Sequence, residues 1–252
     1  MKALIVIPAR FASTRFEGKP LVNIAGKSMI QRTYEQALKA PFDKDVYVAT
    51  DDQRIFDHVT QFGQCIMTSP DHQSGSDRCF EVFSSLPQAY SCVINLQGDE
   101  PFIQPQQIEL LYKAINHTDA DIATLQLPIQ SSEELFNPNV VKVISNLSGM
   151  ALLFSRQSIP YIRGTEQAEW HLKHQYYRHI GMYGFNSNII PQLMHLPLSP
   201  LEQLESLEQL RWLDNGYKIH VSTTDFSSPA VDSPEDLKTV DNFLKIHPEF
   251  AG

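Results

Sequence analysis

The sequence is poor in cysteine, and its cysteines are not spaced for metal binding or redox chemistry. Among 252 residues there are only three, Cys65, Cys79 and Cys92, and no two of them form a CxxC pair. Paired spacings of that kind are typical of zinc sites and of redox motifs. An odd number of isolated cysteines is typical of a reducing compartment. We therefore expect small buried thiols in a cytoplasmic protein.

Long apolar runs are also missing. The apolar stretch nearest the N-terminus, Ala3–Ala9 (ALIVIPA), is followed at once by Arg10. A secretory signal needs an apolar region of about 7–15 residues and a cleavage site, and a membrane span needs about 20 apolar residues. The stretch is better explained as a buried strand, and we expect no insertion into a membrane.

The sequence also has fewer positively charged than negatively charged residues. The chain has 20 Lys and Arg against 29 Asp and Glu, which gives a formal net charge of -9 and a pI near 5.4. This balance argues against a nucleic-acid binder, which usually carries a broad basic face. The apolar content of 42% is ordinary for a globular protein. A chain of this length can form one large domain, and we expect a single domain over residues 1–252.

Apolar runs and amphipathic segments alternate along the first half of the chain. The predicted strands are Ala3–Ala9, 45–50, 65–68 and 92–96. The predicted helices are 28–40, 51–62, 77–86 and 105–116. This alternation, with β-branched residues in the strands, predicts an α/β fold with a parallel sheet covered on both faces.

The second half of the chain changes character. Two apolar segments, 140–145 and 150–155, flank the turn sequence NLSG and predict a hairpin. The remaining predicted elements are a strand at 179–185, one long helix at 201–215, a strand at 220–224, and a helix capped by Ser233 with Pro234 in its first position. We expect a small inserted lobe at about 128–185.

A basic loop follows the first predicted strand. It contains Arg10, Arg15 and Lys19 against a single acid, Glu17. In an open parallel sheet, ligands bind beyond the carboxyl ends of the strands. The loop has neither a GxGxxG nor a GxxxxGK[ST] pattern, so it does not predict a dinucleotide site or a Walker site. Two interpretations remain: a cradle for phosphate oxygens, or a solvated loop.

Two acids stand where a metal site is conceivable. Asp99 follows a predicted strand and a glycine in NLQGDEPF, and Asp232 precedes Ser233. Mg²⁺ takes one or two carboxylates and fills its other positions with phosphate oxygens and water. The alternatives are that Asp99 caps a turn and that Asp232 interacts with a helix dipole. The sequence does not show that the two acids meet.

Seven motifs together carry a resemblance to a known family. In chain order they are IPARFASTRFEGKPL (7–21), DHQSGSDR (71–78), NLQGDEPF (95–102), NPNVVKV (137–143), RHIGMYGF (178–185), PLEQLESLEQLR (200–211) and VDSPEDL (231–237). In this order the sequence resembles the sugar-activating cytidylyltransferases, and among them those that use 3-deoxy-D-manno-octulosonate (KDO). Enzymes that activate sialic acid are similar in the opening loop but are expected to diverge over the later motifs.

The resemblance implies a fold and a reaction. The fold is Rossmann-like, of the nucleotide-diphospho-sugar transferase type: a mainly parallel sheet with helices on both faces and a small inserted dimerisation lobe. The reaction transfers CMP from CTP to the anomeric hydroxyl of KDO, with Mg²⁺, and releases pyrophosphate, for lipopolysaccharide biosynthesis. The resemblance also implies a homodimer.

The resemblance assigns roles to residues of this sequence. The implied catalytic residues are Arg10, Arg15, Lys19 and Asp99. The implied nucleotide contacts are Ala9, Arg10, Ser13, Thr14, Arg15, Lys19, Ser74, Gly75 and Gln97. The implied sugar contacts are Arg78, Gln97, Arg163, His179, Tyr183 and Glu208. The implied metal ligands are Asp99 and Asp232.

The sequence leaves alternatives open. Taken alone, Arg78 is typical of a surface arginine, Glu208 of a solvated helix face, and Tyr183 of a core position. The family's stretch before Arg78 usually has Thr and Glu where this chain has Ser76 and Asp77. A related enzyme for another acidic sugar, such as sialic acid or amino-KDO, would share the core chemistry. A non-catalytic nucleotide-binding protein would be expected to lack Asp99 or the basic loop, and both are present.

Overall fold

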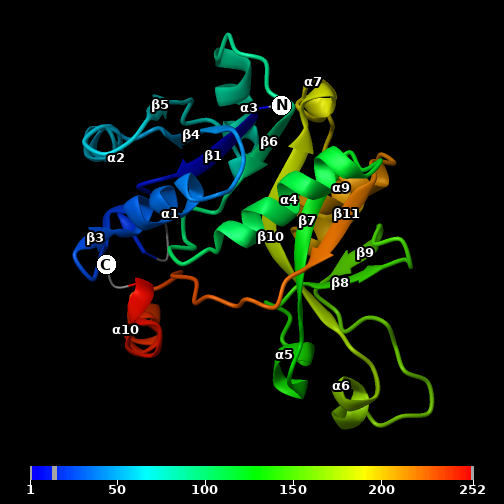
Figure 1. The fold of residues 1–252 in the computed structure, drawn as a ribbon. Helices are drawn as coiled ribbons and strands as arrows, with labels where there is room; N and C mark the ends of the chain where they lie inside the picture. Colours follow the sequence, from blue (N-terminus) through cyan, green and yellow to red (C-terminus); the bar gives the residue numbers. More distant parts are fainter. Residues whose placement is uncertain (1, 13–15, 251–252) are drawn as a thin grey trace. The chain divides into compact units, whose positions relative to one another are not determined.

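The computed structural model describes residues 2–12 and 16–250. The chain divides into two compact units. Unit 1 comprises Met1–Glu109 and Ser227–Gly252, and unit 2 comprises Leu110–Phe226 (Figure 1). Helix α4, Pro105–His117, carries the chain across the division between them. A single domain with an inserted lobe at about 128–185 stays a prediction.

The sheet of unit 1 is parallel throughout. Its strands, in the order in which they pair, are β6 (Cys92–Asn95), β1 (Ala3–Ala9), β4 (Lys44–Thr50) and β5 (Cys65–Met67). Residues 3–7 of β1 are fully buried. Because successive side chains point to opposite faces of a strand, both faces of the sheet are covered there. The predicted α/β fold with a buried parallel sheet is confirmed.

Three helices pack on this sheet, and side chains set where each begins. They are α1 (Met29–Leu38), α2 (Gln53–Val59) and α3 (Gly75–Ser85). Ser28 caps α1, and Asp52 caps α2, which ends at Val59 rather than at Phe62 as predicted. Helix α3 begins before the predicted Asp77, because the Ser74 hydroxyl and the Asp77 carboxylate cap each other's backbone N–H groups at 3.1 Å.

The predicted start of the last helix was wrong. Helix α10 spans Asp236–Ile246, and Ser233 is not its cap. Instead, the Asp236 carboxylate accepts hydrogen bonds from the backbone N–H groups of Asp232 at 2.9 Å and Ser233 at 2.8 Å. These hydrogen bonds lower the pKa of Asp236. They close a turn in front of the helix, which delays its first residue.

Short elements complete unit 1. They are η1 (Lys19–Leu21), the strand pair β2 (Asn23–Ile24) and β3 (Lys27–Ser28), and η4 (Pro248–Phe250). Phe102 packs against Phe243 and Phe250, with ring centroids 4.9 and 5.6 Å apart. This aromatic cluster anchors the C-terminal segment on the same unit as the first strand.

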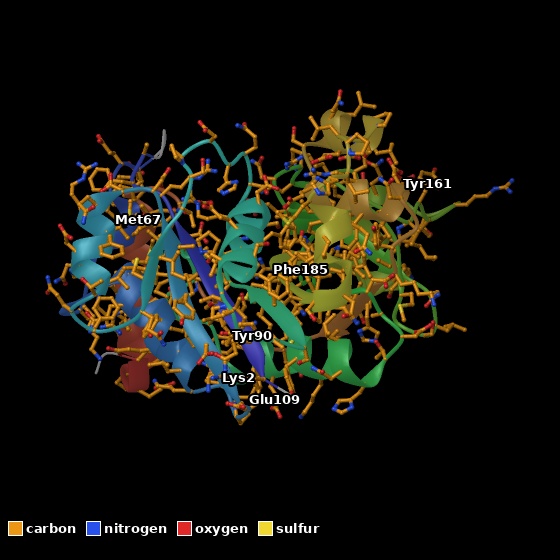
Figure 2. All side chains as sticks on the ribbon, turned by 90° about the horizontal axis from the view of Figure 1, so that it is seen from above. Lys2, Met67, Tyr90, Glu109, Tyr161 and Phe185 are labelled. Carbon is orange, nitrogen blue, oxygen red and sulfur yellow. The ribbon has the colours of Figure 1, made fainter. Side chains whose placement is uncertain are left out.

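Unit 2 has a mixed sheet. Its strands are β7 (Ile122–Pro128), β8 (Lys142–Ser145), β9 (Ala151–Ser155), β10 (Tyr177–Asn186) and β11 (Ile219–Thr223). Strand β7 is parallel to β11 and antiparallel to β10, and β8 is antiparallel to both β9 and β10. The predicted hairpin around residues 146–149 is confirmed. Figure 2 labels Phe185, which is fully buried in this unit, and Tyr161, which is 72% exposed.

Unit 2 also carries several short helices. They are η2 (Gln167–Glu169), α5 (Ser132–Phe136), α6 (Trp170–Lys173), η3 (Ser187–Ile189), α7 (Ile190–Leu193), α8 (Pro200–Glu205) and α9 (Glu208–Asp214). Within the residues that the structure describes, no helix combines the length and the apolar character needed to cross a bilayer.

The single long helix predicted at 201–215 was wrong, since the structure has α8 and α9 there. Ser206 ends α8 in the left-handed conformation, with φ of 52°. The Glu205 carboxylate accepts hydrogen bonds from the Ser155 hydroxyl at 2.7 Å and from the Arg156 backbone N–H at 2.8 Å. Ending α8 here allows Glu205 to bind the end of β9, and α9 then buries Leu210 and Trp212. This contact is tertiary, so the local helical pattern did not predict it.

Candidate active site

A cleft of about 590 Å³ opens at the carboxyl ends of β1 and β6 in unit 1. Its walls are formed by Pro8, Ala9, Arg10, Ala12, Lys19, Pro20, Met29, Gln73, Gly75, Gln97, Gly98 and Asp99. Parallel strands end at one edge of a sheet, which explains why loops distant in sequence meet there. The structure thus gathers six of the predicted site residues around one cleft: Ala9, Arg10, Lys19, Gly75, Gln97 and Asp99.

Lys19 connects the basic loop to both predicted acids. Its Nζ lies 2.9 Å from Asp99 Oδ2 and 3.2 Å from Asp232 Oδ1. The Val231 backbone N–H donates to the Asp99 carbonyl at 3.1 Å, which holds the segment before α10 beside the loop after β6. The two acids therefore meet, although 133 positions separate them in the sequence numbering.

The pair of acids fits a divalent cation. Both carboxylates already share one positive charge, and their side chains are 28% and 46% exposed, so water can reach them. Among the described residues, no group of three or more His, Cys, Asp or Glu side chains is placed to hold a metal ion. Two carboxylates plus water and ligand oxygens are the usual protein environment of Mg²⁺.

Gly98 lets the loop after β6 approach β1. A Cβ atom at this position would lie 2.8 Å from the carbonyl oxygen of Pro8, so a side chain would push the two loops apart. Sequence reasoning missed Gly98 as a wall of the cleft, although its place between a buried strand and Asp99 was a usable signal. Other missed wall residues are Pro8, Pro20, Met29 and Gln73, whereas Ala12 was expected to let the basic loop come close to a ligand.

Arg10 is held by the loop before α3. Its guanidinium donates a hydrogen bond to the carbonyl oxygen of His72. The His72 ring contacts the Glu81 carboxylate, which also accepts from the Ser69 backbone N–H at 2.9 Å. Burial raises the pKa of Glu81, but these hydrogen bonds outweigh it and the pKa falls below its ordinary value. An ionised Glu81 therefore holds the loop on which Arg10 rests.

The other predicted residues of unit 1 have different surroundings. Ser74 caps α3, which leaves the Gly75 end of that helix facing the cleft. Arg78 is fully buried, with its guanidinium on the Thr68 hydroxyl and 3.2 Å from Asp51 Oδ2. This burial does not fit the alternative of a plain surface arginine, and the sugar contact of Arg78 stays a prediction. Ser13, Thr14 and Arg15 lie outside the described residues.

Three of the predicted sugar residues meet in unit 2. The rings of His179 and Tyr183, both on β10, have centroids 5.5 Å apart. The Tyr183 hydroxyl donates to Gln209 Oε1 at 3.1 Å, and burial together with the charge of Glu208 raises the pKa of Tyr183. His179 Nε2 lies 2.8 Å from the Thr124 hydroxyl, and burial lowers the pKa of His179 to about 3. Both groups are therefore neutral at physiological pH.

Arg163, the fourth predicted sugar residue of unit 2, is exposed between β9 and η2. Unit 2 also has a cavity of about 280 Å³ of its own, lined by residues of β8, β9 and the start of β10 together with Ile159, Pro160 and residues 174–176. None of the predicted site residues lines this cavity.

Comparisons with known proteins agree on one family. The cytidylyltransferase family matches residues 4–219. A "3-deoxy-manno-octulosonate cytidylyltransferase" of Parabacteroides distasonis is 48% identical over 97% of this chain and 98% of its own. A protein of the same name from Cytophaga hutchinsonii is 49% identical over 93% of this chain and 94% of its own.

A solved structure is similar over nearly the whole chain. It is the structure of a "CMP:2-keto-3-deoxy-manno-octonic acid synthetase" complexed with CTP. Its sequence is 41% identical, the match covers 98% of this chain and 100% of that one, and the TM-score is 0.90.

Proposed function

The chain belongs to the cytidylyltransferase family, and from that premise we propose that it transfers CMP from CTP to the anomeric hydroxyl of KDO. The products are CMP-KDO and pyrophosphate. The bond from the anomeric oxygen to the α-phosphorus forms as the bond from the α-phosphorus to the bridging oxygen breaks. The hydroxyl proton is lost to solvent. Negative charge grows on the departing pyrophosphate and on the α-phosphate oxygens.

Cationic side chains of the cleft can stabilise this developing negative charge. Arg10 and Lys19 line it, and Arg15 belongs to the same loop in sequence. Donors already in place stabilise developing charge without reorganising during the reaction. The contact from Arg10 to the His72 carbonyl and the hold of Glu81 on that loop supply this preorganisation.

We assign the divalent ion, as Mg²⁺, to Asp99 and Asp232. When bound, Mg²⁺ screens the α-phosphate and polarises the attacking hydroxyl. The two carboxylates converge on a single position and leave most of the coordination sphere to water and phosphate oxygens. We assign the cytidine to Ser74, Gly75 and Gln97, of which Gly75 and Gln97 line the same cleft and Ser74 caps the helix that begins there.

Recognition of the sugar combines charge with neutral polar groups. KDO carries a carboxylate and several hydroxyls, and an arginine can pair with a carboxylate through two hydrogen bonds. We assign the sugar to Arg78, Gln97, Arg163, His179, Tyr183 and Glu208. In unit 2, the neutral His179 and Tyr183 beside the carboxylate of Glu208 suit hydroxyl groups.

The observation that carries the proposal is the convergence of Lys19 with Asp99 and Asp232 at the cleft. The test is pyrophosphate release from CTP, measured with KDO, amino-KDO and sialic acid, each with and without Mg²⁺. We expect release with KDO that depends on Mg²⁺. Release with another acidic sugar alone would change the acceptor and keep the reaction class. No release with any of them would contradict the proposal.

We also propose that the protein is a cytoplasmic homodimer. Its three cysteines, all among the described residues, form no disulfide, which suits a reducing compartment. Unit 2 exposes large apolar side chains, among them Leu147 in the β8–β9 turn and Leu152 on β9, which is 59% exposed. Large exposed apolar side chains are frequent at protein interfaces. Sedimentation at micromolar concentration should give a dimer mass, and Leu152→Asp should give a monomer; a monomeric wild type would contradict the dimer.

A further inference from the structure

Lys19 stands where the proposed divalent ion would stand. Its Nζ is within 3.2 Å of one oxygen from each acid, so the ammonium occupies the space between Asp99 and Asp232. The Lys19 side chain is only 14% exposed, less than either carboxylate. The ammonium brings one positive charge to this place, whereas a divalent ion would bring two.

The same lysine is also assigned to the triphosphate, and these two positions conflict. An ammonium and a divalent ion held by the same two carboxylates would be like charges within a few ångströms of each other, and such charges repel. Once a divalent ion neutralises the acids, the ammonium loses the anions that hold it. The phosphate oxygens of an entering nucleotide are the anions that replace them.

The backbone of this segment is fixed, so the side chain alone has to move. The Gly18 backbone N–H donates to the Phe11 carbonyl at 2.9 Å, and Gly18 has φ of 69°, in the region that favours glycine. The ring of Pro20 is buried directly after Lys19, and the Val22 backbone N–H donates to the Lys19 carbonyl at 3.1 Å. The base of the side chain is therefore anchored, while its flexible four-carbon stem can turn.

From this geometry we propose that Lys19 acts as a place-holder for the divalent ion in the free protein and moves to the triphosphate when the metal-bound nucleotide enters. The inference rests on the proposed function, because it assumes that Asp99 and Asp232 hold the ion. It implies that a divalent ion alone has to compete with Lys19 for the two acids, whereas an ion that arrives with nucleotide does not. Metal and nucleotide therefore bind cooperatively.

The test is the affinity of the nucleotide-free protein for Mn²⁺, followed by electron paramagnetic resonance. Lys19→Met removes the charge and keeps the length of the stem. We expect the affinity for Mn²⁺ alone to rise by about tenfold, the scale on which a charge at this distance changes the occupancy of a neighbouring site. The affinity for CTP, measured by calorimetry in the presence of Mg²⁺, should fall in the same variant.

Two further variants make the result specific. Lys27→Met removes a lysine of the same unit that pairs with Glu35 at 2.8 Å, and it should leave both affinities unchanged. Asp99→Asn in the Lys19→Met background should remove the gain in Mn²⁺ affinity. Lys19→Gln repeats the loss of charge with a polar side chain, and thermal unfolding checks that each variant is folded.

Several results would overturn the inference. If Lys19→Met leaves the Mn²⁺ affinity unchanged or lowers it, the lysine does not compete with the ion. Absence of Mn²⁺ binding by both proteins would also refute it. Pyrophosphate release by the wild type with CTP and KDO tests the proposed function separately. If the wild type is active and Lys19→Met binds Mn²⁺ no more tightly, the proposed function stands and only the place-holder role of Lys19 is refuted.

Discussion

The polar groups of the two units are arranged in opposite ways. In unit 1, charged side chains line an open cleft and pair with one another, and the carboxylates of Asp99 and Asp232 remain 28% and 46% exposed. In unit 2, His179 and Tyr183 are enclosed by aromatic rings: Phe154 lies 4.9 Å from His179, and Trp212 lies 4.9 Å from Tyr183. Burial keeps these two groups neutral.

The difference in exposure indicates how easily the polar groups of each unit can change partners. Water reaches the carboxylates of Asp99 and Asp232 and competes with the Lys19 ammonium for them, which weakens these ion pairs. The pairs of Lys19 can therefore be exchanged for a metal ion and phosphates at little cost. Buried, hydrogen-bonded polar groups are expensive to rearrange, so the group around Tyr183 is suited to recognising one fixed arrangement of hydroxyls. Mutations of Lys19, Asp99 or Asp232 should change turnover or the use of CTP, and mutations around Tyr183 should change the use of the sugar or stability.

The largest effect is expected from Asp99→Asn. The change removes a carboxylate charge without a change in volume, so turnover should fall at least about a hundredfold while the fold is kept. Pyrophosphate release at saturating Mg²⁺, together with thermal unfolding, checks this. The control is Asp119→Asn, which removes an exposed acid of unit 2 paired with Lys218. Turnover of Asp99→Asn near that of the control would refute the assigned role.

Lys19→Ala should have the next largest effect, and it should concern the nucleotide. Loss of a charged donor to phosphate oxygens costs about 1.5–3 kcal/mol, so KM for CTP should rise tenfold or more, with a much smaller change in KM for KDO. Steady-state kinetics with each substrate varied in turn measure the two values. Equal effects on both substrates, or none, would remove Lys19 from the triphosphate site.

Tyr183→Phe should change the use of the sugar and leave the use of the nucleotide unchanged. It removes the hydrogen bond to Gln209, which is 3% exposed, and leaves a buried amide oxygen without its donor. We expect KM for KDO to rise by about tenfold and the free energy of unfolding to fall by about 1–3 kcal/mol. KM for CTP should not change. Tyr161→Phe is the control, since Tyr161 is 72% exposed; an increased KM for CTP in Tyr183→Phe would contradict the division of roles.

The smallest effect at neutral pH concerns His179, because its contribution to the pH dependence of stability develops only in acid. The pKa of His179 is about 3 in the folded protein against an ordinary 6.5. Below about pH 6.5 the unfolded chain takes up a proton at this residue that the folded protein does not, so stability falls as the pH drops from about 6.5 towards 3. His179→Gln should lose this part of the pH dependence of the denaturation midpoint. His195→Gln, at an exposed position, should not; identical profiles for both variants would contradict the burial of His179.

Local patterns were sufficient for the core of unit 1. The apolar run of β1 and the cap at Ser28 act through neighbouring residues, so the alternating α/β order could be predicted. Position at the ends of the strands likewise indicated Asp99 and the basic loop. The motifs supplied the family, because their order along the chain is more specific than any one of them.

Contacts between distant residues could not be predicted in the same way. The break at Ser206 depends on Glu205 reaching Ser155 and Arg156. The late start of α10 has a local cause instead, because Asp236 closes a turn that competes with the predicted cap. The burial of Arg78 could not be predicted, because its helical position says nothing of Asp51 and Thr68, which follow β4 and β5. The meeting of Lys19 with both acids also needed the structure.

The most direct test of the account is a crystal structure of the protein with CTP and Mg²⁺. The account predicts one ion with an oxygen of Asp99 and an oxygen of Asp232 at about 2.1 Å, and Lys19 Nζ on a phosphate oxygen of the same nucleotide. A triphosphate bound away from this cleft, or an ion that touches neither acid, would contradict it.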